Sequence, residues 1–468
     1  FMFKRNAITY AMTGRSLSSQ AYHPLGKVHR RPLPLAFTLL ALLFVSANTY
    51  AQTNWNQTLK AVASDRDNYD RFGYSVAIDG NYAIVGAYNE DNSGTNNTNG
   101  DGAAYLFERN ATTGNWREVK KIVASNRASY DFFGHSVSIS GDYAIVGAYQ
   151  ENENTSGQYP IGNAGAAYLF ERNATTGNWS KVQKIVASDR DNNDWFGYSV
   201  SISGNYAIVS ARREGSLRFR YGQKDDKGAA YIFERNAATG NWREVKKIVA
   251  SNREEYDNFG NSVSISGDYA IVGAERESED ASGKNTKHRA GSAYLFERNA
   301  TTGNWSQVQK IVASYRGYEY FFGCSVSISG NYAIVGAYKY GSTYSYNPRV
   351  GAGSAYLFER NATTGNWSEV QKIADSDGAS GDYFGLSVSI SGQNAIVGAP
   401  RESEDASGQN TKDDAGSVFI FEPLTELVFN GSAWNSNPDN TTSALPAIVQ
   451  SGNPKLAIPA NVKRLRLQ

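Results

Sequence analysis

The chain has very few of the residues on which cross-links and common catalytic sites depend. Its 468 residues include one cysteine, Cys324, and four histidines. A single cysteine excludes an intramolecular disulfide, so packing and hydrogen bonds alone must hold the fold. Two histidines, His23 and His29, lie in an N-terminal segment, and the sequence contains no recognisable Ser-His-Asp set, histidine pair or phosphate-binding loop. We therefore expect a protein that is not an enzyme and needs no cofactor.

Acidic residues are missing from the first 51 positions, which carry six basic side chains: Lys4, Arg5, Arg15, Lys27, Arg30 and Arg31. The whole chain has a formal charge of +1, so the remainder carries −5. A mildly acidic body lacks the basic surface that nucleic acids require. We expect no nucleic-acid partner.

Long apolar runs are also missing, except for LAFTLLALLFV at 35–45, which is 11 residues long. This run is too short to cross a bilayer comfortably. Lys27, Arg30 and Arg31 precede it, and Ala47 and Ala51 follow as candidate cleavage positions, which is typical of a secretion signal. We predict an export segment over 1–51, a secreted or cell-surface protein, and no transmembrane segment after cleavage. A retained membrane anchor is the alternative.

Internal repetition is the strongest signal that is present. The dipeptide Phe-Gly recurs at Phe72, Phe133, Phe196, Phe259, Phe322 and Phe384, at spacings of 61 to 63 residues. Each copy predicts four strands, as in the second unit. HSVSIS at 135–140 alternates in polarity, YAIVGA at 143–148 is almost wholly apolar, and AAYLFER at 166–172 and WSKVQKIVA at 179–187 follow. Four antiparallel strands repeated radially form a propeller blade, and lysines such as Lys120 and Lys121 suit a solvent-facing outer strand.

The two ends of the repeat array complement each other. NWNQTLKAVA at 54–63 resembles a fourth strand without its first three, whereas the last unit, from Phe384 to Glu422, has three strands and no fourth. Pairing the strand around Trp55 with the last unit removes both free edges. The sequence therefore predicts an all-β fold, a six-bladed β-propeller of four-stranded antiparallel blades over 52–422, closed by its N-terminal strand.

The motif FGxSVSISGxYAIVGA followed by GAAYLFER resembles the FG-GAP repeat of the integrin α-subunit head and of bacterial surface proteins. The resemblance covers 55–422 and implies a β-propeller with a role in extracellular recognition. The integrin head has seven blades, so six copies are a departure. The resemblance also implies calcium loops between the first and second strands. The matching positions, such as Ser140-Gly141-Asp142, are tight turns without six to eight oxygen ligands, and we do not transfer that site.

Acidic residues before Phe-Gly offer a separate candidate for calcium: Asp65, Asp67 and Asp70 in the first unit and Asp189, Asp191 and Asp194 in the third. Three carboxylates at short spacing suit a hard cation. The alternative is that aspartate caps a turn, because it stands two residues before phenylalanine in five of the six units.

The copies differ most between their second and third strands. The third loop is basic and contains Arg218 and Arg220; the fifth contains Tyr338, Tyr340, Tyr344 and Tyr346. Loops on a rigid scaffold commonly bind ligands, and exposed tyrosines suit an extracellular protein or glycan partner. We expect a binding or adhesion scaffold. The alternatives are a purely structural repeat domain of a larger surface protein and a propeller hydrolase or lyase.

The last segment, 423–468, changes in composition to Asn, Ser and Pro. It resembles the start of a small β-module that stops early, and a linker with partial strands is the simpler interpretation.

Overall fold

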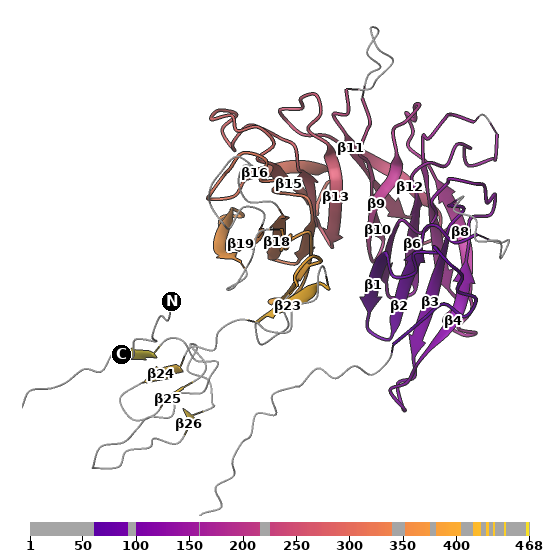
Figure 1. Ribbon diagram of the computed structural model, residues 1–468, viewed down its shortest axis with the longest axis horizontal. Helices are drawn as coiled ribbons and strands as arrows, with labels where there is room; N and C mark the ends of the chain where they lie inside the picture. Colours follow the sequence, from indigo (N-terminus) through magenta and orange to yellow (C-terminus); the bar gives the residue numbers. More distant parts are fainter. Residues whose placement is uncertain are drawn as a thin grey trace, which may run out of the picture. The chain divides into compact units, whose positions relative to one another are not determined.

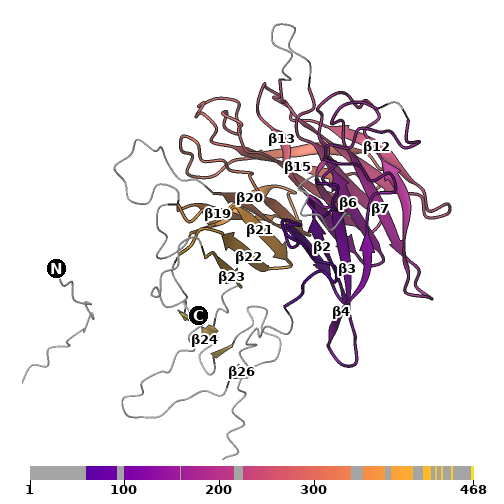
Figure 2. The same ribbon diagram turned by 45° about the vertical axis from the view of Figure 1, so that its right-hand side comes forward.

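The computed structural model describes residues 60–91, 100–158, 160–215, 225–338, 352–374, 381–403 and 415–422, and the backbone of four short strands between 427 and 467. Regular structure in these ranges consists of β-strands. Within them, no helix has the length and apolar character needed to span a membrane. Six sheets follow one another in chain order, one from each repeat, in the arrangement of a propeller (Figures 1 and 2). The predicted all-β, six-bladed fold is confirmed.

Each of the first five blades contains four antiparallel strands, paired in chain order. Blades 1 to 3 contain β1 (Ser75–Asp79), β2 (Tyr82–Ala87), β3 (Ala103–Arg109), β4 (Trp116–Ile122), β5 (Ser136–Ser140), β6 (Tyr143–Ala148), β7 (Ala166–Arg172), β8 (Trp179–Ile185), β9 (Phe196–Ser203), β10 (Tyr206–Ala211), β11 (Ala229–Arg235) and β12 (Trp242–Ile248). Blades 4 to 6 contain β13 (Phe259–Ser266), β14 (Tyr269–Ala274), β15 (Ser292–Arg298), β16 (Trp305–Ile311), β17 (Val326–Ser329), β18 (Tyr332–Ala337), β19 (Ser354–Arg360), β20 (Trp367–Ile373), β21 (Ser387–Ser391), β22 (Asn394–Ala399) and β23 (Ser417–Phe421).

The apolar pattern places the second strand inside its blade. In β6 every residue after Tyr143 is buried, as a continuous apolar run predicts for a strand covered on both faces. The chain then crosses to β7 through a long loop, whereas β5 and β6 are joined by a two-residue turn at 141–142. The fourth strand forms the outer edge of the sheet.

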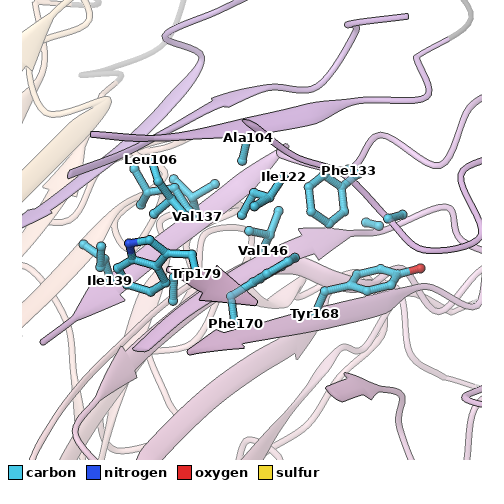
Figure 3. Close-up of a cluster of buried hydrophobic side chains, with 14 of the residues drawn as sticks. Ala104, Leu106, Ile122, Phe133, Val137, Ile139, Val146, Tyr168, Phe170 and Trp179 are labelled. Atoms are coloured by element: carbon cyan, nitrogen blue, oxygen red, sulfur yellow. The ribbon is translucent and has the colours of Figure 1, made fainter. Parts of the chain in front are cut away.

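The core lies between adjacent blades rather than within one sheet. Leu106 and Ile122 of blade 1 pack against Val137, Val146 and Phe170 of blade 2 (Figure 3). The phenylalanine of Phe-Gly lies at the centre of this layer. The ring of Phe133 meets that of Tyr168 edge-on at a centroid distance of 5.3 Å. Each repeat contributes side chains to the core layer on either side of its sheet. Each blade therefore needs one such phenylalanine.

The glycine of Phe-Gly allows the blades to approach each other. Gly134 adopts a φ of 90°, and a Cβ atom there would lie 2.2 Å from the carbonyl oxygen of Ala103 in the preceding blade. Only glycine tolerates both the dihedral angle and the contact. In blade 3, Ser210 stands where the second strands of the other blades have glycine. A Cβ atom added to Gly260 of the next blade would lie 3.0 Å from the Cβ atom of Ser210.

Serines of the first strands join successive blades around the axis. In blade 2 the hydroxyls of Ser136, Ser138 and Ser140 accept hydrogen bonds from the backbone N–H groups of Val200, Ile202 and Gly204 at 3.0, 3.2 and 3.2 Å. The first strand is an inner edge, so its outward N–H groups have no neighbouring strand. The polar face of SVSIS therefore serves as a ladder of acceptors between blades.

The junction between the last and first blades differs from the others. The described part of blade 6 has three strands, β21 to β23. Most of the predicted closing strand, 54–59, lies outside the described residues, and Lys60 to Ala63 belong to no strand. Ala63 is nevertheless buried against Ala87 and Tyr105, and Ser64 binds Glu118 as Ser188 binds Glu244 in a complete blade.

The C-terminal segment contains a small sheet with the order β26-β25-β24-β27. Its strands are β24 (Leu427–Phe429), β25 (Trp434–Asn435), β26 (Ala444–Leu445) and β27 (Leu465–Leu467).

Candidate functional site

The strand order separates the connections of every blade into two ends. The turns between strands 1 and 2 of the six blades, and between strands 3 and 4 of the first five, lie at one end and are nearly identical from copy to copy. The loops between strands 2 and 3, and from strand 4 to the next strand 1, lie at the other end. These two sets contact each other: the N–H of Asn89 donates to the carbonyl of Asp70, and that of Asn193 to the carbonyl of Gly162. We call these the uniform end and the variable end.

A cluster of rings occupies the start of the first strands at the variable end. The imidazole of His135 lies among four tyrosines of three blades. Its centroid is 5.1 Å from that of Tyr74, 6.0 Å from Tyr88, 4.7 Å from Tyr149 and 5.0 Å from Tyr198. The Tyr74 hydroxyl lies 3.3 Å from Nε2 of His135. We call these five residues the axial cluster.

The axial cluster is electrically neutral around its histidine. Burial lowers the pKa of His135 to about 4, and the nearby Arg212 guanidinium acts in the same direction. Burial also raises the pKa of Tyr149 to about 12. The imidazole and the Tyr149 hydroxyl are therefore uncharged at neutral pH, and both remain able to form hydrogen bonds.

Charged and polar side chains continue the site into blades 3 and 4. Arg212 donates to the Tyr198 hydroxyl at 2.7 Å and forms an ion pair of 3.4 Å with Glu275. Asn261 donates to Glu275 at 3.3 Å and to the carbonyl of Cys324 at 3.0 Å. Burial raises the pKa of Cys324 to about 12, so its thiol is unreactive at neutral pH.

Tyr338 is the one described residue among those predicted to bind a ligand through the loops. Its ring stacks on Phe321 at 5.1 Å and meets Tyr383 edge-on at 5.5 Å, at the variable end. Arg218, Arg220, Tyr340, Tyr344 and Tyr346 lie outside the described residues.

The six aspartates proposed as calcium ligands bind protein donors. Lys121 donates to Asp65 at 2.6 Å and Tyr105 at 2.8 Å. Partial burial of Asp65 disfavours its charge, but these bonds outweigh the burial and lower its pKa. Asp189 repeats the pattern with Lys247 and Tyr231.

The remaining four aspartates belong to turns. Asp70 accepts from the N–H of Asp67, and Asp194 from the N–H of Asp191, both at 2.6 Å. This is the turn-capping geometry that the repeated aspartate indicated. In the described ranges no group of three Asp, Glu, His or Cys side chains is placed to hold a metal ion.

Blades 2 and 4 contain a different arrangement, a buried pair of carboxyl groups. Asp131 and Glu151 are each 1% exposed. Burial, with the neighbouring charge of Glu151, raises the pKa of Asp131 to about 8. Asp257 beside Glu277 shows the same shift for the same reasons. At neutral pH each pair therefore shares one proton.

The outer lysines distinguish these two kinds of blade. Lys121, which the sequence assigned to a solvent-facing edge, instead binds Asp65 and Glu90, the latter at 2.7 Å. Arg127 also binds Glu90. In blade 2 the corresponding Lys184 is buried and lies 3.4 Å from Glu151. That prediction was wrong for Lys121 because the strand turns this side chain towards the acidic loop, whereas its neighbour Lys120 is exposed.

Two grooves occupy equivalent places beside the outer strands of blades 2 and 4. The groove at blade 4 has a volume of about 690 Å³ and is lined by Asp280, Lys310 and Trp367, among others. The groove at blade 2 measures about 520 Å³ and includes Asn154 and Lys184. Their lining side chains are largely engaged in bonds within the protein, as Lys287 is with the carbonyl of Arg316 at 2.8 Å.

Sequence reasoning missed the axial cluster. The position two residues after the phenylalanine holds Leu386 and Cys324 in two of the units, and such a mixture in the sequence is typical of a packing position. The available signal was the enrichment in aromatic residues at Tyr74, His135 and Tyr198. The pattern could not show that adjacent copies of this slot face one another across blades.

The fold and the two ends define a β-propeller repeat scaffold. The chain belongs to the FG-GAP repeat family, whose model matches six segments: 55–107, 116–170, 179–233, 242–296, 305–358 and 367–421. The search of curated proteins found no match. Among solved structures, a protein from Lactobacillus plantarum is similar, at 14% identity and a TM-score of 0.40 over 75% of this chain and 88% of that chain. A likeness of this size carries no argument about function.

Proposed function

We propose that this chain is an exported recognition scaffold that binds a protein or a glycan at the variable end of its propeller. The observation that carries the proposal is the separation of the two ends. Loops of different length and composition gather at one end with the axial cluster, while the other end repeats the same tight turns. A rigid scaffold with divergent loops on one side is a common design for recognition.

Composition supports export and binding rather than catalysis. The basic segment and short apolar run before residue 51 are typical of a secretion signal. The axial cluster supplies aromatic rings, and the adjacent Arg212 supplies a guanidinium; tyrosine and arginine are enriched where proteins bind partners.

The function is tested by blocking one end at a time. Cys324 is only partly exposed and the raised pKa of its thiol keeps it protonated, so a cysteine introduced at an exposed position can be labelled selectively. Asn192→Cys lies at the variable end and Thr175→Cys at the uniform end, and both sites are exposed. Each full-length variant would receive a bulky polyethylene glycol group and be applied to arrays of extracellular proteins and glycans.

We expect the label at residue 192 to abolish binding and the label at residue 175 to leave it unchanged. Equal binding by both labelled proteins would contradict recognition at the variable end. Absence of binding by the unlabelled protein on every array would favour the alternative, a purely structural repeat domain. Retention of an N-terminally intact chain inside producing cells would contradict export.

A further inference from the structure

An exposed tyrosine recurs at one position of the variable end, three residues before the phenylalanine of Phe-Gly. It is Tyr69 in blade 1, Tyr130 in blade 2 and Tyr256 in blade 4. The three residues are 62%, 56% and 39% exposed. Burial of the ring in a core therefore does not explain the choice of tyrosine at this position.

The backbone at this position makes tyrosine an unfavourable choice. The φ angles of the three tyrosines are 68°, 69° and 67°, in the left-handed region. Asparagine is strongly preferred there over bulky residues. Blade 3 has Asn193 at this position, with a φ of 59°. The fold thus accepts asparagine without change, yet three blades carry an exposed aromatic residue instead.

Hydrogen bonds hold the strained turn, from the preceding blade in blades 3 and 4 and from within the same blade in blade 1. The N–H of Tyr256 donates to the carbonyl of Asp225 at 2.7 Å, and the N–H of Asn193 to that of Gly162 at 2.8 Å. The side-chain amide of Asn89 donates to the carbonyl of Tyr69 at 2.9 Å. A strained conformation that its surroundings fix is frequently found at a binding site.

Polar groups accompany each ring. Asp67 and Asn68 precede Tyr69, Arg127 and Ser129 precede Tyr130, and Glu254 and Glu255 precede Tyr256. An exposed ring with polar residues next to it in the chain suits a sugar, whose C–H groups pack on the ring and whose hydroxyls hydrogen-bond to polar groups.

The spacing of the tyrosines favours a polysaccharide over a protein partner. Protein hot spots cluster at the centre of one desolvated patch, whereas these tyrosines lie on three separate blades, with Phe132 beside Tyr130 at a centroid distance of 6.3 Å. Equivalent subsites on a rigid scaffold gain affinity when the ligand repeats one unit along its length. We propose that Tyr69, Tyr130 and Tyr256 are equivalent sugar-stacking subsites for a polysaccharide. This inference rests on the proposed function and names its ligand class.

The experiment compares polysaccharide binding by the full-length chain with binding by variants that carry asparagine, the residue found in blade 3, at the tyrosine positions. The probes are a β-1,3-glucan, a β-1,4-xylan, a mannan and chitin, and binding is measured by affinity electrophoresis or sedimentation. The triple variant Y69N/Y130N/Y256N takes the residue that blade 3 already uses, so its melting temperature should equal or exceed that of the parent. We expect it to lose roughly 100-fold or more in affinity for the polysaccharide that the parent binds.

Two further variants test the role of the ring. Y69F/Y130F/Y256F keeps the aromatic faces and should retain most of the affinity. Asn193→Tyr adds a fourth subsite and should tighten binding several-fold. Absence of binding to all four polysaccharides, or undiminished binding by the asparagine variant, would overturn the inference. So would a loss by the phenylalanine variant as complete as that by the asparagine variant.

The outcomes separate this inference from the proposed function. If the label at residue 192 blocks a protein ligand on the arrays while no polysaccharide binds, recognition at the variable end stands and the sugar subsites fail. If neither the label at residue 192 nor the label at residue 175 changes binding on the arrays, the proposed recognition at the variable end is contradicted.

Discussion

At the scale of single residues, the repeats use two solutions for buried acidic side chains. Blades 1 and 3 neutralise Glu90 and Glu214 with a lysine and an arginine. Blades 2 and 4 place a second carboxyl group beside Glu151 or Glu277 with a lysine farther away, so protonation replaces the missing positive charge. A buried carboxylate needs either a cation or a proton, and alternate repeats contain one or the other.

The paired carboxyl groups make stability depend on pH. The pKa of Asp131 and of Asp257 is about 8 in the fold, above the value of about 4 in an unfolded chain. A raised acid pKa contributes stability that is complete below pH about 4 and is lost as pH rises through about 8. We expect the melting temperature to fall by roughly 2–4 °C between pH 6 and 9.

The double variant D131N/D257N provides the control, because an amide can donate to the partner carboxylate without titrating. We expect its melting temperature to change less over the same interval, as measured by calorimetry. If the melting temperature of the variant falls as steeply with pH, or if that of the parent does not fall, the carboxyl pairs are not the origin of the pH dependence.

At the scale of the strand, the serine ladder explains why SVSIS recurs. Alternation alone predicts a polar face towards water, yet Ser138 accepts the N–H of Ile202 in the next blade. Blade 1 departs from the pattern: Ala77 stands where blade 2 has Ser138, and Asp79 accepts the N–H of Gly141 at 2.7 Å. The first blade thus keeps this hydrogen bond to the next blade, but its acceptor is the carboxylate of Asp79 instead of a serine hydroxyl.

The ladder gives a matched pair of substitutions. Ser138→Ala removes the acceptor of the Ile202 N–H and should destabilise the protein by about 1–2 kcal/mol. Ala77→Ser supplies an acceptor to the N–H of Ile139 and should stabilise it by about 0.5–1 kcal/mol. Denaturant unfolding measures both. Equal, near-zero effects would mean that water serves the inner edge as well as serine does.

At the scale of the whole propeller, the first and last blades carry two unmatched halves of one core layer. Val76 and Ile78 of β1 are 68% and 66% exposed, and Val418 and Ile420 of β23 are 67% and 50% exposed. Their counterparts inside the array, such as Val137 at 7%, are buried against a neighbouring blade. Faces of this composition are expected to pack together once the last blade has its fourth strand.

We predict that these faces meet within one chain, with the strand around Trp55 paired to β23. Ile78 and Ile420 correspond to Ile139 and Leu106, which share one core cluster. The variant I78C/I420C should therefore form an intramolecular disulfide on mild oxidation, detected as a monomer with altered mobility on non-reducing gels. The single variants I78C and I420C are the controls. Disulfide-linked dimers from the double variant would contradict closure within one chain.

The sequence by itself determined the units of this protein. Strand boundaries, the buried second strand and the number of blades follow from local polarity and a period near 63 residues, as YAIVGA at β6 illustrates. The capping role of Asp70 was also visible, because turn geometry depends on neighbouring residues.

Only the tertiary structure decided which side chains meet across blades. His135 contacts Tyr74 and Tyr198, each about one repeat away, and Lys121 turns towards Asp65. The spacing of the repeats in the sequence does not reveal which way each side chain points where two blades meet. That direction follows from the twist of the sheets and their close approach at glycine, which are properties of the packed blades.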